Sequence, residues 1–340
     1  SPSPWWAPAR HDDRRPFLRA RGMVTRTERD WFQAQGFTEV ESAALQVSPG
    51  NETHLHAPLT HVTSSAGARA PRYLRTSPEF ACKKLLAAGE ERIVEFARVF
   101  RDRESGPLHL TEFTMLEWYR ADAPYDAVIA DCLAVIAAAA EATGAGGFSF
   151  RGRAAAERLS VAEAFRRHAY IDLLATVSGG AGHRDALAAM AKEAVRGTPD
   201  DTWSDIFSKV LTEYVEPQLG QGRLTVLDEY PAPEAALARA KPSDPRVSER
   251  FEIYACGVEL ANGFGELTDA AEQRRRFNEA MDEKERRYGE RYPLDDDFLA
   301  ALSRMPPACG VALGFDRLVM LASGATRLDQ VVWAPADAAS

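Results

Sequence analysis

Charged side chains stand out in an otherwise apolar stretch from residue 93 to 120, IVEFARVFRDRESGPLHLTEFTMLEWYR. Glutamate and arginine among large apolar residues need partners, because burying an unpaired ion costs roughly several kcal/mol. The stretch allows two interpretations. One is an internal ion pair. The other is a surface that binds a zwitterionic or phosphorylated ligand, with Arg101 for an anion and Glu117 with Tyr119 for an amine.

A second candidate pair is Glu259 and Glu266, which lie seven residues apart across Asn262-Gly263-Phe264-Gly265. We expect the two glycines to let the backbone bend and bring both carboxylates to one point. Paired carboxylates next to a phosphate site suit Mg²⁺, which takes oxygen ligands and bridges to substrate phosphates. The alternative is two solvated acids on a strand edge.

The third candidate lies in CGVALGFDRLVML, residues 309–321. We expect an apolar strand that ends at Gly314 and a helix that opens at about Asp316, with Arg317 in its first turn. Glycine at such a turn allows close approach of a ligand, and a helix N-terminus favours anions. A strand, glycine and helix in this order occur in many proteins, so this segment indicates an anion site only together with the others.

Alternation of residue types predicts that residues 93–101 and 113–120 form a long β-hairpin, joined by a polar loop with a Gly-Pro pair. By the period of two, each arm presents one set of side chains on a single face. These sets are Ile93, Glu95, Ala97, Val99 and Arg101 on the first arm, and Phe113, Met115, Glu117 and Tyr119 on the second.

Helix signals flank the hairpin. Residues 74–91 contain a helix start with Ser77 at the N-cap, Pro78 at the first helical position and Glu79 in the first turn. Capping explains these residues, but the helix start could also direct Glu79 towards the hairpin. We further expect a flexible arm over residues 1–15, a helix over 16–35, a strand over 37–42 and a mostly helical insertion over about 127–215.

Composition limits the classes of function. The chain has 340 residues, 45% hydrophobic content and a net charge of -9, which argues against binding nucleic acid through a generally basic surface. No apolar run is long enough to cross a bilayer, so we expect no membrane association. Four cysteines without CxxC spacing indicate reduced thiols and a cytoplasmic protein.

Three segments together resemble the signature motifs of class II aminoacyl-tRNA synthetases. QGFTEVES is similar to motif 1, FRDRE followed by HLTEFTMLEWYR to motif 2, and GVALGFDRLVML to motif 3. EFTMLEWY and GVELANGFGELTDA resemble lysyl-tRNA synthetase, over about residues 16–335. Because motif 1 begins almost at the N-terminus, we expect no anticodon-binding domain. RTSPE, EFTMLEWYR and GVELANGF resemble the truncated paralogues that attach (R)-β-lysine to a lysine of elongation factor P.

The resemblance implies an α+β catalytic core around a mostly antiparallel sheet, a homodimer, and ATP with Mg²⁺ as cofactors. Arg101 and Arg317 would be catalytic, at the α- and γ-phosphates respectively. Substrate contacts would come from Ser77, Pro78, Glu79, Glu117, Tyr119 and Glu266, and metal ligands from Glu259 and Glu266. ATP contacts would come from Arg101, Asp102, Arg103, Glu104, His109, Leu110, Glu259, Leu260, Gly314 and Arg317.

Two positions depart from the family pattern. The family has Arg-x-Glu in motif 2, and here Arg103 stands at the third position with Glu104 after it. Leu110 replaces an asparagine that would contact ATP. Either the loop shifts so that Glu104 serves, or ATP is bound less tightly.

The resemblance predicts activation of lysine or (R)-β-lysine as an adenylate and transfer to elongation factor P, with no role for tRNA. Two alternatives are open: a non-catalytic synthetase-like subunit that binds a ligand, and an adenylate-forming ligase with a small-molecule acceptor.

Overall fold

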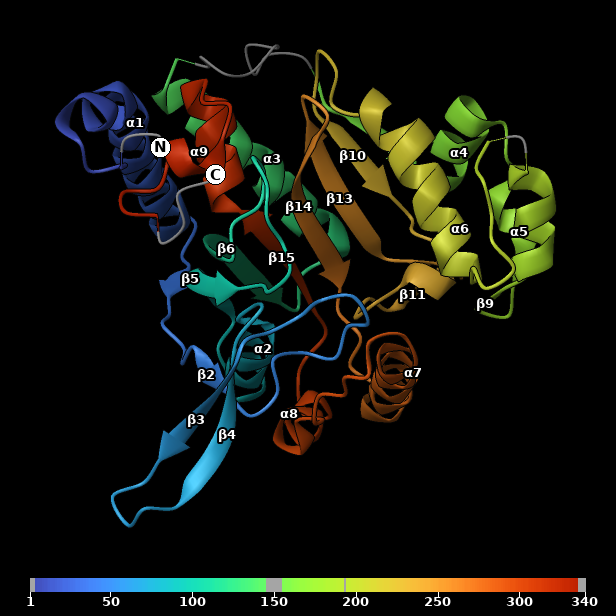
Figure 1. The fold of residues 1–340 in the computed structure, drawn as a ribbon. Helices are drawn as coiled ribbons and strands as arrows, with labels where there is room; N and C mark the ends of the chain where they lie inside the picture. Colours follow the sequence, from blue (N-terminus) through green and yellow to red (C-terminus); the bar gives the residue numbers. More distant parts are fainter. Residues whose placement is uncertain (1–3, 145–154, 193, 336–340) are drawn as a thin grey trace.

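The computed structural model describes residues 4–144, 155–192 and 194–335 (Figure 1). Its centre is a sheet of eight strands in the order β1-β5-β6-β15-β14-β13-β10-β7. The pairing is antiparallel except at the two edges, where β1 with β5 and β7 with β10 are parallel. This confirms the predicted α+β class. The strands are β1 (Thr38–Glu39), β5 (Arg92–Phe100), β6 (Glu112–Ala121), β15 (Ala308–Gly314), β14 (Val258–Gly265), β13 (Arg250–Ala255), β10 (Thr225–Asp228) and β7 (Glu157–Ser160).

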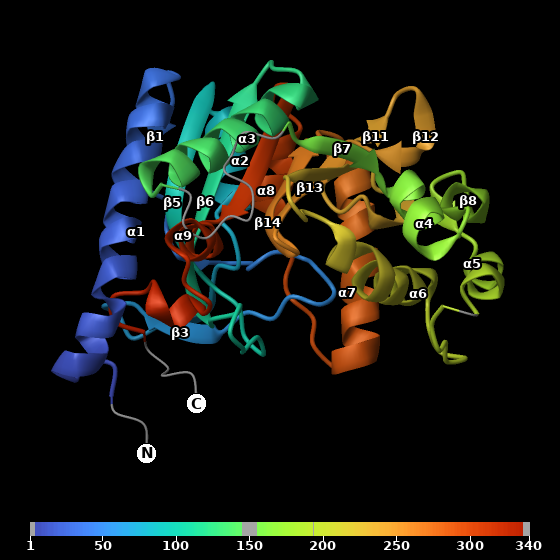
Figure 2. The same cartoon turned by 90° about the horizontal axis from the view of Figure 1, so that it is seen from above.

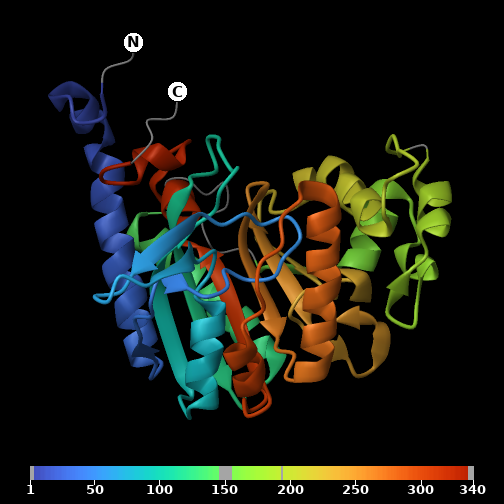
Figure 3. The same cartoon turned by 60° about the horizontal axis from the view of Figure 1, so that its bottom comes forward.

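Helices cover both faces of this sheet (Figures 2 and 3). One face packs against α1 (Pro8–Ala34), α3 (Tyr125–Ala142) and α9 (Phe315–Ser323), through the largest apolar core, to which Leu116 and Trp118 belong. The other face packs against α2 (Glu79–Ala87), α7 (Ala270–Tyr288) and α8 (Asp296–Leu302), through a core that includes Ile93 and Tyr119. Neighbouring residues of β5 and β6 therefore point to opposite layers, as the period of two requires.

The hairpin β5–β6 has the predicted faces. Ile93 pairs with Tyr119, and Glu95 pairs with Glu117. These side chains face the side of the sheet on which α2 packs, and the acidic part of the candidate site lies on this side. The turn between β13 and β14 falls at Cys256 and Gly257, both with positive φ, at the predicted position.

Smaller elements surround the central sheet. A three-stranded sheet of β2 (Leu45–Gln46), β3 (Leu59–Thr63) and β4 (Arg69–Leu74) projects from the body (Figure 1). On the opposite side, α4 (Val161–Ala169), α5 (Arg184–Ala191) and α6 (Trp203–Val210) enclose a separate core with the hairpin β8 (Val177–Ser178) and β9 (Ala181–Gly182). The remaining elements are the pair β11 (Ala240–Lys241) and β12 (Asp244–Ser248), and the short turns η1 (Leu173–Thr176), η2 (Leu211–Val215), η3 (Glu216–Gln218), η4 (Ala232–Glu234) and η5 (Leu328–Gln330).

The structure corrects several predicted bounds. Residues 8–15, expected in a flexible arm, belong to α1, because buried Arg14 and Leu18 continue its core-facing stripe and the Arg14 guanidinium donates to the carbonyl of Val332. The strand expected over 37–42 is reduced to the two residues of β1. The stretch 127–215 is mostly helical but supplies β7 to the main sheet. Its part from 145 to 154 lies outside the described residues. Within the described chain, no helix is long and apolar enough to span a bilayer.

Candidate active site

A cleft of about 1420 Å³ opens beside the hairpin β5–β6, strands β14 and β15, and helix α7. Many of the predicted site residues line this cleft, which confirms that they share one cavity. They are Ser77, Glu79, Arg101, Glu104, His109, Leu110, Glu259, Leu260, Gly314 and Arg317.

One end of the cleft, the acidic end, is lined by Ser77 and Glu79. Glu117, which is 1% exposed, lies buried behind Ser77. One carboxylate oxygen of Glu117 accepts a hydrogen bond from Ser77 Oγ at 3.1 Å, and the other accepts from the Tyr119 hydroxyl. Burial and the nearby Glu79 carboxylate raise the pKa of Glu117 to about 8. Because desolvation destabilises the charged carboxylate, a cationic partner would stabilise the ionised form of Glu117.

Lys83, which the sequence interpretation missed, is buried behind this end of the cleft and contacts a residue that lines it. Its Nζ lies 2.6 Å from Glu79 Oε1 and 2.6 Å from Glu266 Oε2. Burial raises the pKa of Glu266 to about 7, although the Lys83 ammonium acts in the opposite direction. Among the described residues, Lys83 therefore pairs with Glu79 and Glu266, whereas Glu117 forms no salt bridge. The three carboxylates and one ammonium leave an excess of two negative charges when all three carboxylates are ionised.

Gly310 of β15 lies beneath the acidic end. A Cβ at this position would collide with the Tyr119 ring and lie 2.8 Å from Glu266 Oε1. Only glycine leaves room for both side chains, and this close approach fixes where the phenol and the carboxylate stand.

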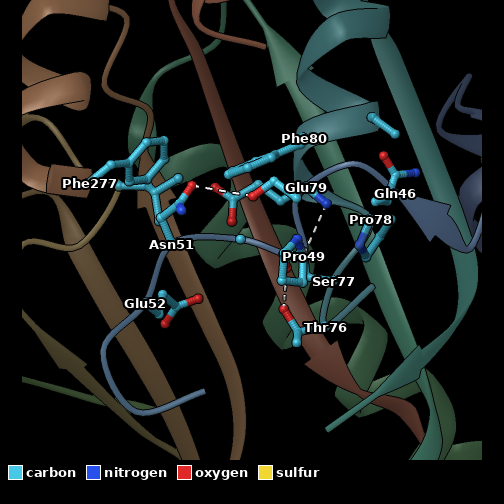
Figure 4. Close-up of a pocket in the computed structure, with 14 residues that line it drawn as sticks. Gln46, Pro49, Asn51, Glu52, Thr76, Ser77, Pro78, Glu79, Phe80 and Phe277 are labelled. Atoms are coloured by element: carbon cyan, nitrogen blue, oxygen red, sulfur yellow. Dashed lines mark hydrogen bonds between the residues drawn. The ribbon is translucent and has the colours of Figure 1, made fainter. Parts of the chain in front are cut away.

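A small pocket adjoins the acidic end, where the loop with Asn51 and Glu52 faces the start of α2 (Figure 4). Ser77 Oγ accepts from the Glu79 amide at 2.9 Å, which satisfies one free N–H of this helix start. The loop itself is held by Lys284, whose Nζ donates to the carbonyls of Thr53 at 3.1 Å and Leu55 at 2.7 Å. The wall opposite Ser77 is thus tied to α7.

The other end of the cleft is cationic. Arg317, in the first turn of α9, donates to the carbonyls of Glu259 at 2.9 Å and Leu108 at 3.3 Å, and lies 3.0 Å from His109 Nε2. Arg101 lies over the Phe113 ring at 5.4 Å, and its buried Nε has no hydrogen-bond partner among the described residues. Within the described chain, neither guanidinium forms a salt bridge, so both charges are available to an anion.

The expected convergence of Glu259 and Glu266 is wrong. The two residues stand at opposite ends of β14, which is a continuous strand and spans roughly 20 Å at the usual rise per residue. Gly263 and Gly265 do not bend it. They make room for Phe251 and Glu249 on the neighbouring strand and turn, with which a Cβ would collide.

Glu259 instead has Glu252 of β13 as its acidic neighbour. Burial and the Glu252 charge raise the pKa of Glu259 to about 7. Glu252 is held by Arg250 Nη2 at 2.8 Å and by the Tyr254 hydroxyl at 2.7 Å. The sequence signal was available: Glu252 is the acidic residue that alternates with apolar ones in RFEIY.

Asp102 and Arg103 do not line the cleft. Arg103 has a φ of 63° and forms a salt bridge with Glu290, at the end of α7. The Asp102 amide donates to the His56 carbonyl at 2.8 Å. Glu104, one residue later, does line the cleft, as the shifted-loop alternative requires.

An antiparallel sheet that carries a hairpin, a glycine-ended strand and an arginine-bearing helix around one charged cleft defines a class II aminoacyl-tRNA synthetase catalytic core. The chain belongs to the family of tRNA synthetases class II (D, K and N), whose model matches residues 5–338.

Within this family, the chain is similar to proteins named elongation factor P--(R)-beta-lysine ligase. That of Edwardsiella ictaluri is 37% identical over 318 residues, which cover 93% of this chain and 93% of the relative. That of Klebsiella pneumoniae subsp. pneumoniae is 37% identical over 319 residues, with 93% and 94% covered. That of Yersinia enterocolitica is 37% identical over 325 residues, with 94% of each chain covered.

Proposed function

We propose that this protein is an AMP-forming ligase. It activates (R)-β-lysine, or a closely related diamino acid, with ATP and transfers the acyl group to a lysine of elongation factor P. It works as a cytoplasmic homodimer and does not use tRNA. One observation carries the proposal: three carboxylates and one lysine lie at one end of the cleft, and two arginines that form no salt bridge within the described chain, Arg101 and Arg317, lie at the other.

The acidic end suits a substrate with two ammonium groups. Lysine and β-lysine each carry two, and the excess charge of Glu79, Glu117 and Glu266 over Lys83 matches them. The Tyr119 hydroxyl, which donates to Glu117, and Ser77 fix the orientation of that carboxylate. A neutral aliphatic side chain would leave these buried charges without partners.

The cationic end suits ATP. In the first step, a carboxylate oxygen of the amino acid attacks the α-phosphorus of ATP, a new P–O bond forms and the bond to pyrophosphate breaks. Arg101 binds the α-phosphate and the substrate carboxylate, and Arg317 binds the γ-phosphate. Both stabilise the negative charge that develops on the phosphate oxygens.

Glu259, which lines the cleft, is the carboxylate whose chemistry fits Mg²⁺ at this end, in place of the pair expected from the sequence. Glu252, next to it, is already held by Arg250 and Tyr254. Within the described chain, no cluster of three or more His, Cys, Asp or Glu side chains could hold a metal. The ion would therefore take most of its ligands from phosphate and water, as Mg²⁺ commonly does. When bound, Mg²⁺ neutralises phosphate charge and orients the triphosphate.

In the second step, the deprotonated ε-amine of the acceptor lysine attacks the carbonyl carbon of the adenylate, an amide forms and AMP leaves. The net charge of -9 supports a protein acceptor over tRNA, because tRNA binding draws on phosphate contacts from a basic surface. The names of the relatives support elongation factor P as that protein.

Pyrophosphate exchange tests the proposal. Purified protein with ATP and Mg²⁺ is offered (R)-β-lysine, L-lysine and norleucine, which has the lysine skeleton without the second amine. We expect exchange with the diamino acids and little with norleucine. Absence of exchange with every amino acid would refute the ligase. If lysine analogues and ATP bind without exchange, the protein is the non-catalytic subunit that the outward-facing Arg103 and apolar Leu110 would favour.

A further inference from the structure

Arg21 links the N-terminal helix to the ATP end of the cleft. It lies in the middle of α1, and its Nη1 is 2.5 Å from Asp316 Oδ1. Both side chains are largely buried, with 11% of Arg21 and 2% of Asp316 exposed. The guanidinium also lies over the Phe315 ring, at 5.1 Å from its centroid. Ion pairs buried to this degree depend on both partners, because removing one leaves a buried charge uncompensated.

The same guanidinium reaches two more segments. Arg21 Nη2 donates to Thr114 Oγ1 on β6 at 3.1 Å, and Nη1 donates to the Val331 carbonyl at 3.1 Å. The second oxygen of Asp316 accepts from the Thr114 amide at 2.9 Å. Arg21, Asp316 and Thr114 therefore form a closed triangle that joins α1, β6 and the first turn of α9.

This triangle adjoins both proposed ATP contacts. Asp316 directly precedes Arg317, and Thr114 directly follows Phe113, whose ring lies under the Arg101 guanidinium. The far end of Arg317 is held by the carbonyls of Glu259 and Leu108. The backbone of Arg317 lies in the first turn of α9, and the contacts of Asp316 with Arg21 and Thr114 fix the position of that turn.

We propose that Arg21 is a positioning residue for ATP, which acts through Asp316 on Arg317 and through Thr114 on the strand that carries Phe113. This inference rests on the proposed ligase function and adds a residue to it that touches neither substrate. Arg21 belongs to α1, on the face of the sheet opposite to α2, on whose side Glu117 and Lys83 lie. Its loss should therefore weaken ATP use and leave amino-acid recognition almost intact.

The test compares Arg21→Met and Asp316→Asn with the parent in pyrophosphate exchange. Arg29→Met is the matched control, because Arg29 is on the same helix, lies over the Phe96 ring and pairs with the exposed Glu39. We expect KM for ATP to rise about tenfold or more in both test variants, since small displacements of positioning groups have effects of this size, while KM for the amino acid changes less than about twofold. The control should match the parent.

Three further measurements keep the outcomes separate. Arg21→Lys, which keeps a charge, should recover part of the ATP affinity. The double variant should be little worse than either single one, because both remove the same contact. Calorimetric titration with a non-hydrolysable ATP analogue reads the same effect without turnover.

The inference is overturned if Arg21→Met leaves KM for ATP unchanged, or if it raises both KM values equally, which would indicate a structural role only. If Arg21→Met does not fold, the KM for ATP of Asp316→Asn decides the question, because this variant keeps the shape of the side chain and one acceptor oxygen. A parent protein that exchanges with no amino acid would refute the proposed ligase instead, and calorimetry would still decide the role of Arg21 in ATP binding.

Discussion

Glu95 and Glu117 are direct neighbours across the hairpin β5–β6, yet only one of them is neutralised. Glu95 forms a salt bridge with Arg75 at 2.8 Å and accepts from Ser42 Oγ at 2.7 Å. Among the residues that the structure describes, Glu117 has only hydroxyl donors, from Ser77 and Tyr119. Like charges in this arrangement repel. Pairing of Glu95 thus removes one charge and leaves Glu117 as the carboxylate that a cationic substrate can satisfy.

Replacing Glu117 by Gln should lower kcat/KM for diamino acids. The loss should correspond to about 2 to 4 kcal/mol of transition-state stabilisation, the range for breaking a desolvated charge pair. Exchange kinetics with (R)-β-lysine and L-lysine measure this. The matched control is Glu112→Gln on the same strand, where the carboxylate is exposed and lies 3.8 Å from Arg98. The control should equal the parent. If Glu117→Gln and the parent have the same kcat/KM for each diamino acid, Glu117 is not the partner of the substrate ammonium group.

Binding of the amino acid should strengthen as pH rises from about 6 to 8. Without substrate, burial raises the pKa of Glu117 to about 8 and that of Glu266 to about 7. An ammonium group binds the ionised forms, so at lower pH it must first displace protons. KM for lysine in exchange should fall across this range, and fall less in Glu117→Gln. A parent KM that does not vary with pH would contradict this account of the site.

Glu28 provides a test of stability that is independent of function. It is 0% exposed on the core side of α1, and its carboxylate has no hydrogen-bond partner in the part of the chain that the structure describes. Burial raises its pKa to about 8. Because this pKa is above the unfolded value of about 4.3, the folded state binds the extra proton, and stability should fall as pH rises from about 4.5 to 8.

Glu28→Leu should therefore raise the free energy of unfolding at pH 8 by about 1 to 4 kcal/mol, with a smaller gain near pH 5. Urea denaturation at both values measures this. Glu28→Gln is the control that keeps the shape and cannot titrate, and it should also flatten the pH dependence. A gain in stability that is the same at both pH values would show that Glu28 is not the titrating group.

Gly310→Ala should impair the acidic end, because its Cβ meets the Tyr119 ring and Glu266. Overpacking of this kind destabilises by roughly 1 to 3 kcal/mol, and the displaced phenol should raise KM for the amino acid. Gly314→Ala is the steric comparison for stability, since its Cβ would make ordinary contacts of 3.6 to 3.8 Å with Arg317. Equal unfolding free energies for the two alanine variants would mean that the Tyr119 and Glu266 side chains move aside for the new Cβ without strain.

Local patterns predicted the elements of the site. The period of two in residues 93–120 predicted the hairpin and its faces, because successive side chains of a strand point to opposite faces. The strand that ends at Gly314 and the helix with Arg317 in its first turn followed from glycine and apolar periodicity. These features depend on a few neighbouring residues and are therefore readable from the chain.

Contacts between distant segments could not be read in this way. Gly263 and Gly265 looked like a bend, but each makes room for a side chain outside its own strand, which no local pattern reveals. Lys83 looked like an ordinary helix residue, and only the packing of α2 against β14 and β15 makes it the partner of Glu266. The effect of Glu252 on Glu259 likewise depends on the register of β13 against β14, which places Glu259 opposite Tyr254.

The most direct test of the central claim is a transfer reaction. Purified protein is incubated with ATP, Mg²⁺ and (R)-β-lysine, and elongation factor P or bulk tRNA is added in separate reactions. Intact mass of the factor and acid-precipitable acyl-tRNA are then measured. We predict that the factor gains the mass of one β-lysyl group at a lysine and that tRNA is not charged. Charging of tRNA without a mass gain on the factor would contradict the proposed function.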